Sequence, residues 1–193
     1  MSNKVRQMLL MDDHVCPWWL CYAFDNPLRR LIHNPEKMLR AWIKPGQTVI
    51  DVGCGMGYFS LPMARLVGDT GRVIAVDLQA QMLDRLQRRA ERAGLQSRIQ
   101  PYRCQPDTLA LSEPADFILT FWMVHEVPHQ AAFLQEIRTL LKPTAQYLLV
   151  EPKLHVAATD FQQTVQTAQA AGLRAIAQPK VGLSRAVLFG PVM

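Results

Sequence analysis

From residue 35 onward, short apolar runs rich in β-branched residues alternate with helix-like segments, and this alternation constrains the fold most strongly. The runs predict strands at 48–52, 73–76, 98–104, 117–121, 147–151, 173–177 and 184–189. Between them, the spacing predicts helices at 35–43, 58–67, 79–93, 131–141 and 159–171. Strands separated by helices indicate an α/β, doubly wound, mostly parallel seven-stranded sheet. Because only residues 178–183 join the last two strands, these are expected to form an antiparallel edge hairpin.

Residues with positional preferences mark several helix boundaries. Asn34 followed by Pro35 predicts an N-cap and a first helical position. Pro62 predicts that the second helix starts late or bends. Thr159 to Gln162 has the pattern of a capping box, which predicts that the last helix opens there with Thr159 as its cap.

The segment Asp51-Val52-Gly53-Cys54-Gly55-Met56-Gly57 lies between the first predicted strand and a helix. Glycine permits backbone angles that other residues avoid, and it removes side chains where a ligand must approach closely. In an open parallel sheet, ligands bind beyond the carboxyl ends of the strands. The segment is therefore expected to be a ligand-binding loop.

Two carboxylates accompany this loop. Asp77 closes the second strand, 20 residues after Gly57, where it can accept hydrogen bonds from both hydroxyls of a ribose. Asp51 can hold a cation such as an ammonium group and would repel a pyrophosphate. The pair favours a nucleoside carrying an ammonium group over a dinucleotide. A nicotinamide-dependent oxidoreductase is a less favoured alternative, because the glycines are spaced Gly-x-Gly-x-Gly rather than Gly-x-Gly-x-x-Gly.

Residues 49–57 resemble the first motif of the class I S-adenosylmethionine-dependent methyltransferases, and residues 73–77 resemble the second. The similarity continues through 115–120 and 140–143 and covers about residues 35 to 151. The subgroup closest in appearance is the small-molecule type found in ubiquinone and menaquinone biosynthesis. The resemblance implies a Rossmann-like fold, S-adenosyl-L-methionine as methyl donor, and a small-molecule acceptor that the sequence does not identify.

The resemblance also implies a role for individual positions in cofactor binding. Asp51, Gly53 and Gly55 would lie near the methionine part, in a loop that Cys54 and Gly57 complete. Asp77 would hold the ribose, Leu78 would pack on the adenine, and Thr120 would lie near the amino acid end of the cofactor. Gln105 takes the place of the family's acidic residue that accepts from the adenine amino group, with Asp107 as the alternative. No metal site is expected.

The candidate acceptor residues follow the fourth predicted strand. His125 and Glu126 are candidate catalytic bases, although His125 could equally order its own loop. Glu151, at the end of the fifth strand, is the next candidate. The set His14, Trp18, Trp19 and Tyr22 would line the acceptor pocket if residues 1–34 form a lid, and would be core packing otherwise.

The composition, with 49% hydrophobic and 19% charged residues, predicts one globular domain over residues 1–193, with residues 35–193 as its core. We expect a cytoplasmic protein without signal peptide or membrane span, and four reduced cysteines. The net charge of +5 permits an RNA or protein acceptor but does not favour one, because the arginines at 85, 88, 89 and 92 occupy the solvated face of a predicted helix. A protein that binds the cofactor without catalysis is a further alternative.

Overall fold

The computed structural model describes residues 33–192, and their strands form one seven-stranded sheet. The strands are β1 (Thr48–Val52), β2 (Arg72–Asp77), β3 (Ile99–Arg103), β4 (Ala115–Phe121), β5 (Leu141–Pro152), β6 (Leu173–Ala177) and β7 (Ser184–Pro191). Their order is β3-β2-β1-β4-β5-β7-β6. Every pairing is parallel except those of β7, which runs antiparallel to both β5 and β6. The predicted fold class is confirmed, with β7 inserted between β5 and β6.

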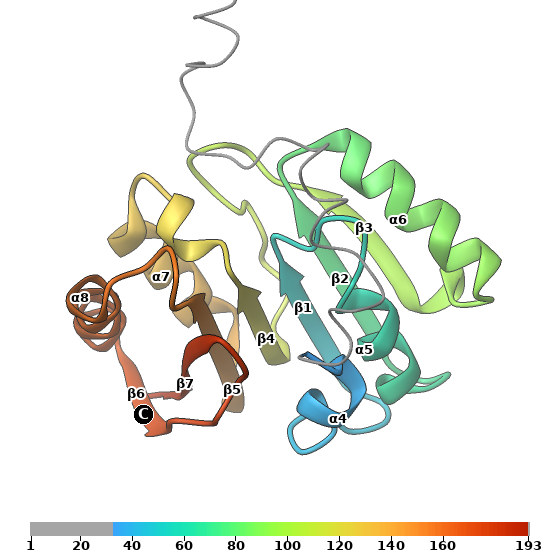
Figure 1. Cartoon of the computed structure of the whole chain (residues 1–193). Coiled ribbons are helices and arrows are strands. Elements are labelled where there is room, and N and C mark those ends of the chain that lie inside the picture. The colour runs from blue at the N-terminus through green and yellow to red at the C-terminus, as the bar shows by residue number, and fades with distance from the viewer. Residues whose placement is uncertain (1–32, 193) are drawn as a thin grey trace, which may run out of the picture.

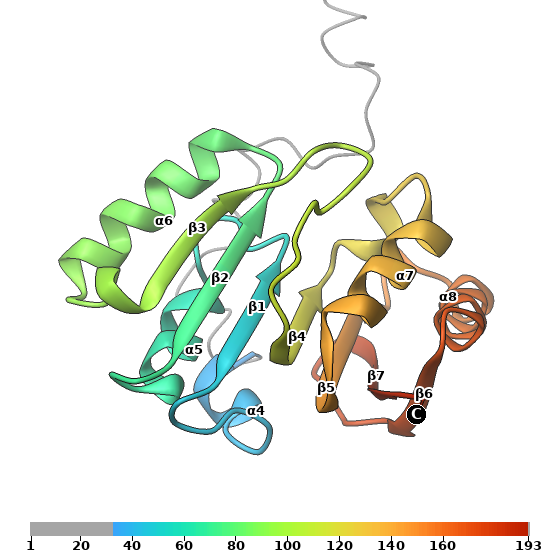
Figure 2. The same ribbon diagram turned by 180° about the vertical axis from the view of Figure 1, so that it is seen from behind.

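Helices cover both faces of the sheet and give three layers (Figures 1 and 2). One face carries α4 (Pro35–Leu39), α5 (Ser60–Val67) and α6 (Ala80–Arg92), and the other carries α7 (Gln130–Leu140) and α8 (Ala158–Ala170). Each face has its own hydrophobic core: the first core lies under α4, α5 and α6, and the second lies under α7 and α8. Successive strand residues point to opposite faces, so Val49 packs in the first core and Ile50 in the second. The strands are apolar on both faces because both faces are covered.

Short 3₁₀ turns, η1 (Gln96–Arg98) and η2 (Val124–Glu126), precede β3 and follow β4. The connection from β3 to β4 contains no helix. Instead, residues 104–114 run over the sheet, and Leu109 is buried among the residues of the second core. Among residues 33–192, no helix has both the length and the apolarity that a membrane crossing requires.

The predicted starts of the first two helices are confirmed. Asn34 caps α4 by accepting from the Lys37 N–H at 3.0 Å, and α5 starts late, at Ser60, with Pro62 in its first turn. The predicted end of the first helix is wrong. The N–H groups of Trp42 and Ile43 both donate to the Leu39 carbonyl, which closes α4 at Leu39.

The predicted capping box of α8 is also wrong. The helix begins at Ala158 with Ala157 as its N-cap, so Thr159 already lies inside the first turn. Its hydroxyl contacts Asp160 Oδ1 at 3.2 Å and caps no backbone N–H. The local pattern was present, but the chain enters the helix earlier than that pattern indicates.

Candidate functional site

A cavity of about 650 Å³ lies at the carboxyl ends of the strands, where β1 and β4 are neighbours and the strand order reverses. Its volume is in the range of small-molecule sites, about 300–1,000 Å³. The lining includes residues 51–56, 77–79, 104–109, 121–123 and 125–129, together with Pro152, Leu154, His155 and Leu183. The cavity therefore occupies the place where doubly wound sheets bind their ligands.

The glycine loop is fastened to the end of β2. The N–H groups of Gly53 and Cys54 donate to the Val76 carbonyl, and the Gly55 N–H donates to Asp77 Oδ2 at 2.8 Å. Gly53 and Gly55 have φ values of 72° and 52°, in the left-handed region that favours glycine. The predicted loop conformation is thus present, and both glycines line the cavity.

Asp51, near the end of β1, is only 2% exposed although it lines the cavity. Ser60, the first residue of α5, donates its hydroxyl to Asp51 Oδ2 at 2.5 Å. The pKa of Asp51 is raised from 3.8 to about 7, chiefly by burial and also by the charge of Asp77, against the hydrogen bonds from Ser60, which lower it. A positively charged ligand group next to Asp51 would therefore stabilise its ionised form.

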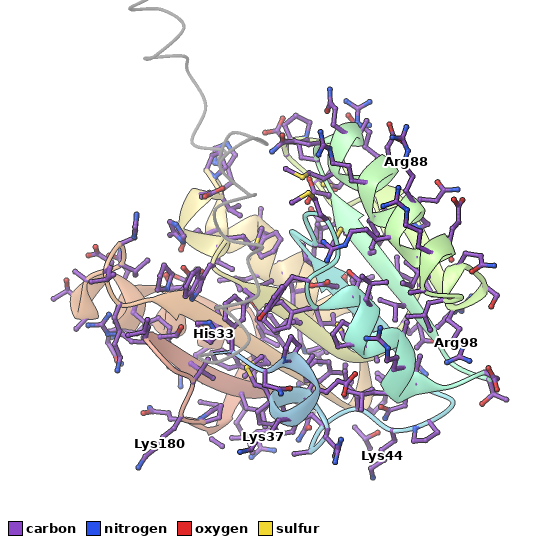
Figure 3. All side chains as sticks on the ribbon, turned by 45° about the vertical axis from the view of Figure 1, so that its right-hand side comes forward. His33, Lys37, Lys44, Arg88, Arg98 and Lys180 are labelled. Carbon is purple, nitrogen blue, oxygen red and sulfur yellow. The ribbon has the colours of Figure 1, made fainter. Side chains whose placement is uncertain are left out.

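Asp77, at the end of β2, accepts from the Gly55 N–H at 2.8 Å and from the Gln79 N–H at 2.9 Å. Burial still raises the pKa of Asp77, because it outweighs these hydrogen bonds. Within residues 33–192, no Lys, Arg or His forms an ion pair with Asp51 or Asp77. Lys44 and Arg98, which precede β1 and β3, lie at the amino ends of the strands (Figure 3). The Asp51 and Asp77 carboxyl groups thus give this part of the cavity a negative electrostatic potential.

The predicted adenine contacts lie together in the cavity. Leu78 follows β2, while Gln105 and Asp107 lie in the exposed turn after β3, and all three line the cavity. Glu136 of α7 holds this turn, because its Oε2 accepts from the Thr108 hydroxyl at 3.0 Å and from the Leu109 N–H at 2.8 Å. Glu136 was not predicted from the sequence, since its contacts lie 27 and 28 residues away along the chain.

Of the three acceptor candidates, His125 and Glu151 are within hydrogen-bonding distance of each other. His125 Nδ1 lies 2.5 Å from Glu151 Oε2, and Glu151 Oε1 accepts from the Val124 N–H at 2.9 Å. Glu126 Oε1 is 4.0 Å from His125 Nε2. The hydrogen bond to Glu151 raises the pKa of His125, against a smaller effect of burial that lowers it. His125 and Glu126 line the cavity, whereas Glu151 is 1% exposed behind them.

Trp122, directly after β4, has a φ of 62°, which is unusual for a bulky residue. Its indole Nε1 donates to the Ser184 hydroxyl at 2.9 Å, and its backbone N–H donates to the Val150 carbonyl. These bonds hold the left-handed turn in place. Such backbone strain is concentrated at functional sites, and Trp122 forms part of the cavity wall.

Two predicted cofactor positions do not reach the cavity. Thr120 is fully buried, and its hydroxyl bonds to that of Tyr147 at 2.8 Å inside the second core. Gly57 is buried against α6, where an added Cβ would lie 2.2 Å from Leu86 Cδ1. Neither residue lines the cavity, so a role of these two in cofactor binding stays a prediction. Cys54 lines the cavity as predicted, while His14, Trp18, Trp19 and Tyr22 lie outside the described residues.

A family model described as a methyltransferase domain matches residues 49–144, which include the glycine loop, Asp77 and the strands up to β4. The chain belongs to the class I S-adenosylmethionine-dependent methyltransferase family. The predicted family is therefore confirmed, and the matched region carries most of the cavity residues.

Similar proteins within this family include two curated enzymes. A 2-phytyl-1,4-naphtoquinone methyltransferase from Nostoc sp. is 31% identical over 156 residues, covering 78% of this chain and 66% of the relative. A ubiquinone biosynthesis O-methyltransferase from Paraburkholderia xenovorans is 32% identical over 133 residues, covering 65% and 53%. The chain thus spans about half to two thirds of the length of these relatives.

A solved structure agrees with the fold over nearly the whole chain. It is a SAM-dependent methyltransferase from Aquifex aeolicus with a TM-score of 0.83 and 24% identity. The match covers 92% of this chain and 100% of the other. The Aquifex protein therefore has the same fold, and its whole length lies within the match.

Proposed function

We propose that this chain binds S-adenosylmethionine at the carboxyl edge of its sheet and catalyses methyl transfer to a small molecule. The observation that carries the proposal is the pair of buried carboxylates, Asp51 and Asp77, on either side of a glycine loop. Their charges have no counter-ion among the described residues. A ligand with one ammonium group and two hydroxyl donors would supply the missing partners.

In this proposal each predicted residue has a definite task. Asp51 holds the ammonium group, and Asp77 accepts from the ribose hydroxyls while it fastens Gly55. Leu78 packs on the adenine, and Gln105 or Asp107 accepts from its amino group. When bound, S-adenosylmethionine supplies an electrophilic methyl group. The protein contributes orientation and the exclusion of water.

The acceptor is proposed to be a small molecule with an apolar ring. Phe121 and Trp122 form one wall of the cavity, and Leu154 and Leu183 lie at its rim. Two of the similar proteins are named for ubiquinone biosynthesis and for a phytyl naphthoquinone, which are ring compounds of this kind. The apolar lining and these relatives support the same class of acceptor.

The remaining predictions complete the proposal. The chain is one methyltransferase domain, residues 1–34 serve as its arm or lid, and it acts in the cytoplasm. The basic face of α6, with Arg88 at the surface in Figure 3, lies outside the cavity lining, so an RNA acceptor is not favoured.

Thermal unfolding in the presence of matched ligands tests the proposal. S-adenosylmethionine and S-adenosylhomocysteine should each raise the Tm, because a ligand that binds only the folded state stabilises it by mass action. NAD at the same concentration should not. A larger shift with NAD, or no shift with either sulfur nucleoside, would reverse the assignment.

A further inference from the structure

Glu151 and His125 form a hydrogen-bonded pair in which Glu151 is buried and His125 faces the cavity. Glu151, on β5, is 1% exposed and fully engaged, with one oxygen on the Val124 N–H and the other on His125 Nδ1. His125, on η2, lines the cavity and keeps a partly exposed side chain. The buried carboxylate is thus in contact with the cavity only through the imidazole.

This arrangement fixes the histidine tautomer. A carboxylate can only accept, so the Nδ1 atom of His125 carries the proton that is donated to Glu151. The neutral ring therefore has its lone pair on Nε2. The group nearest to Nε2 that forms a charged contact is Glu126, at 4.0 Å, which is beyond hydrogen-bonding distance. Nε2 remains able to accept a proton from a bound molecule.

One oxygen of Glu151 orders the loop through the Val124 N–H, and the other is directed at the imidazole that lines the cavity. Burying a charge is costly, and Glu151 lies under the cavity wall and not at the surface. The strained Trp122 lies three residues before His125 and supports the same wall. A buried carboxylate behind a cavity-facing imidazole is an arrangement that increases the basicity of the imidazole.

We propose that His125 is the base that removes a proton from a hydroxyl group of the acceptor, and that Glu151 is its positioning residue. The acceptor class is thereby narrowed to phenols and related hydroxyl compounds, methylated on oxygen. This inference rests on the proposed function, because it assigns the second substrate of that same cavity.

The proton of the acceptor hydroxyl passes to His125 Nε2, and the oxygen forms a new bond to the methyl carbon. The sulfur–carbon bond breaks, and its electron pair stays on sulfur, which becomes a neutral thioether. The imidazolium, stabilised by Glu151, then releases its proton to water.

Among the described residues, two carboxylates act on the titration of the imidazole. Glu151 on β5 and Glu126 on η2 both favour the protonated ring. Arg185 on β7 lies opposite Glu151 in the strand register, but its guanidinium donates to the Val156 carbonyl at 2.8 Å. The base form of His125 is present above its raised pKa, so methylation should increase as the pH rises through that value.

The first test measures the ring directly and needs no cofactor. Nitrogen NMR of the full chain, with His125 assigned by a His125→Gln variant, should show Nδ1 protonated in the neutral ring and a pKa above 6.5. The Glu151→Gln variant should lower that pKa. A Glu36→Gln variant is the control, because Glu36 lies on α4 outside the cavity and should leave it unchanged. A neutral ring protonated on Nε2 would overturn the proposal.

The second test compares two acceptors that share one ring system, 2-naphthol and 2-naphthalenethiol. With S-adenosylmethionine, 2-naphthol should give the methyl ether. His125→Gln should decrease its kcat about 100-fold and Glu151→Gln about 10-fold, with KM nearly unchanged. In Glu151→Gln, the ascending limb of the pH profile should move to lower pH. The aryl thiol is more acidic than a cysteine thiol and is therefore ionised at pH 8 without a base, so it should respond less to either substitution.

The two proposals fail in different ways. If S-adenosylhomocysteine binds in calorimetry but 2-naphthol yields no ether, or the ether forms equally well in His125→Gln, the base assignment is wrong while cofactor binding stands. If S-adenosylhomocysteine itself fails to bind to the folded chain, both proposals are wrong.

Discussion

The Ser60 hydroxyl donates a 2.5 Å hydrogen bond to Asp51 Oδ2, with Ser60 fully buried and Asp51 only 2% exposed. The bond joins the start of α5 to the end of β1, across the glycine loop. It is one of the interactions that keep the pKa of Asp51 from rising above about 7. Ser60 therefore sets how much of the Asp51 side chain is ionised near neutral pH.

Replacing Ser60 by Ala should weaken S-adenosylhomocysteine binding at pH 7. The pKa of Asp51 rises when the hydroxyl is removed, so a larger fraction of the carboxyl is protonated and lacks the charge that attracts an ammonium group. The loss should be about 10-fold, in keeping with a hydrogen bond to a charged group. Calorimetry at pH 7 and at pH 9 measures it, and the loss should be smaller at pH 9.

A matched control is Thr164→Ala, which also removes a buried hydroxyl but lies on α8, away from the cavity. It should leave the affinity unchanged at both pH values. If Ser60→Ala weakens binding equally at pH 7 and pH 9, the link between Ser60 and the charge of Asp51 is refuted.

Asp51→Asn should stabilise the free protein while weakening ligand binding. In the folded state the pKa of Asp51 is about 7 and not 3.8, so ionisation destabilises the fold progressively as the pH rises between these values. Above pH 7 the penalty is complete and is roughly 4 kcal/mol. The Tm of the variant should therefore exceed that of wild type at pH 8, but not at pH 3.5.

The same variant should bind S-adenosylhomocysteine on the order of 100-fold more weakly, because a buried charge pair is lost. Differential scanning calorimetry and a titration on the same samples measure both effects. A variant that is less stable than wild type at pH 8 would show that Asp51 is held by interactions other than those described.

The two glycines Gly55 and Gly57 should respond differently to alanine. An added Cβ at Gly57 would overlap Leu86 Cδ1, whereas at Gly55 it would meet no atom within 4 Å. Both positions have positive φ, which costs an alanine about 1–2 kcal/mol. Gly57→Ala should therefore lower the free energy of unfolding by several kcal/mol, and Gly55→Ala by about 1–2 kcal/mol. Equal destabilisation in urea unfolding would contradict the packing described for α6.

Glu136→Ala should weaken binding of the nucleoside although the residue lies on α7. It removes the two hydrogen bonds that hold Thr108 and Leu109, and with them the turn that carries Gln105 and Asp107. The Kd for S-adenosylhomocysteine should rise about 3- to 10-fold. The affinity for methionine alone, which would not reach this turn, should not change.

The sequence predicted those parts of the site whose evidence is local. The strand, the glycines and Asp51 are consecutive, and Asp77 is found by counting from the loop to the end of the next strand. Their positions relative to one another follow from the parallel pairing of β1 and β2. Local signals also marked the start of α4 at Asn34 and the late start of α5.

The remaining parts depend on contacts that the sequence does not contain. Thr120 was placed at the correct strand end, but the pleat turns its side chain toward Tyr147 on β5. Glu151 and His125 were separate candidates because 26 residues lie between them, and only the β4–β5 pairing brings them together. Ser60 was missed, although a hydroxyl residue opening the helix after a glycine loop was a usable indication.

The most direct test of the account is a calorimetric titration of the wild-type chain with S-adenosylhomocysteine at pH 8, where Asp51 is ionised. We predict saturable one-to-one binding that is markedly weaker in Asp51→Asn and that NAD does not reproduce. A folded protein that shows no saturable binding of this nucleoside, or that binds it equally well without the Asp51 charge, would contradict the claim that the two buried carboxylates form a nucleoside site.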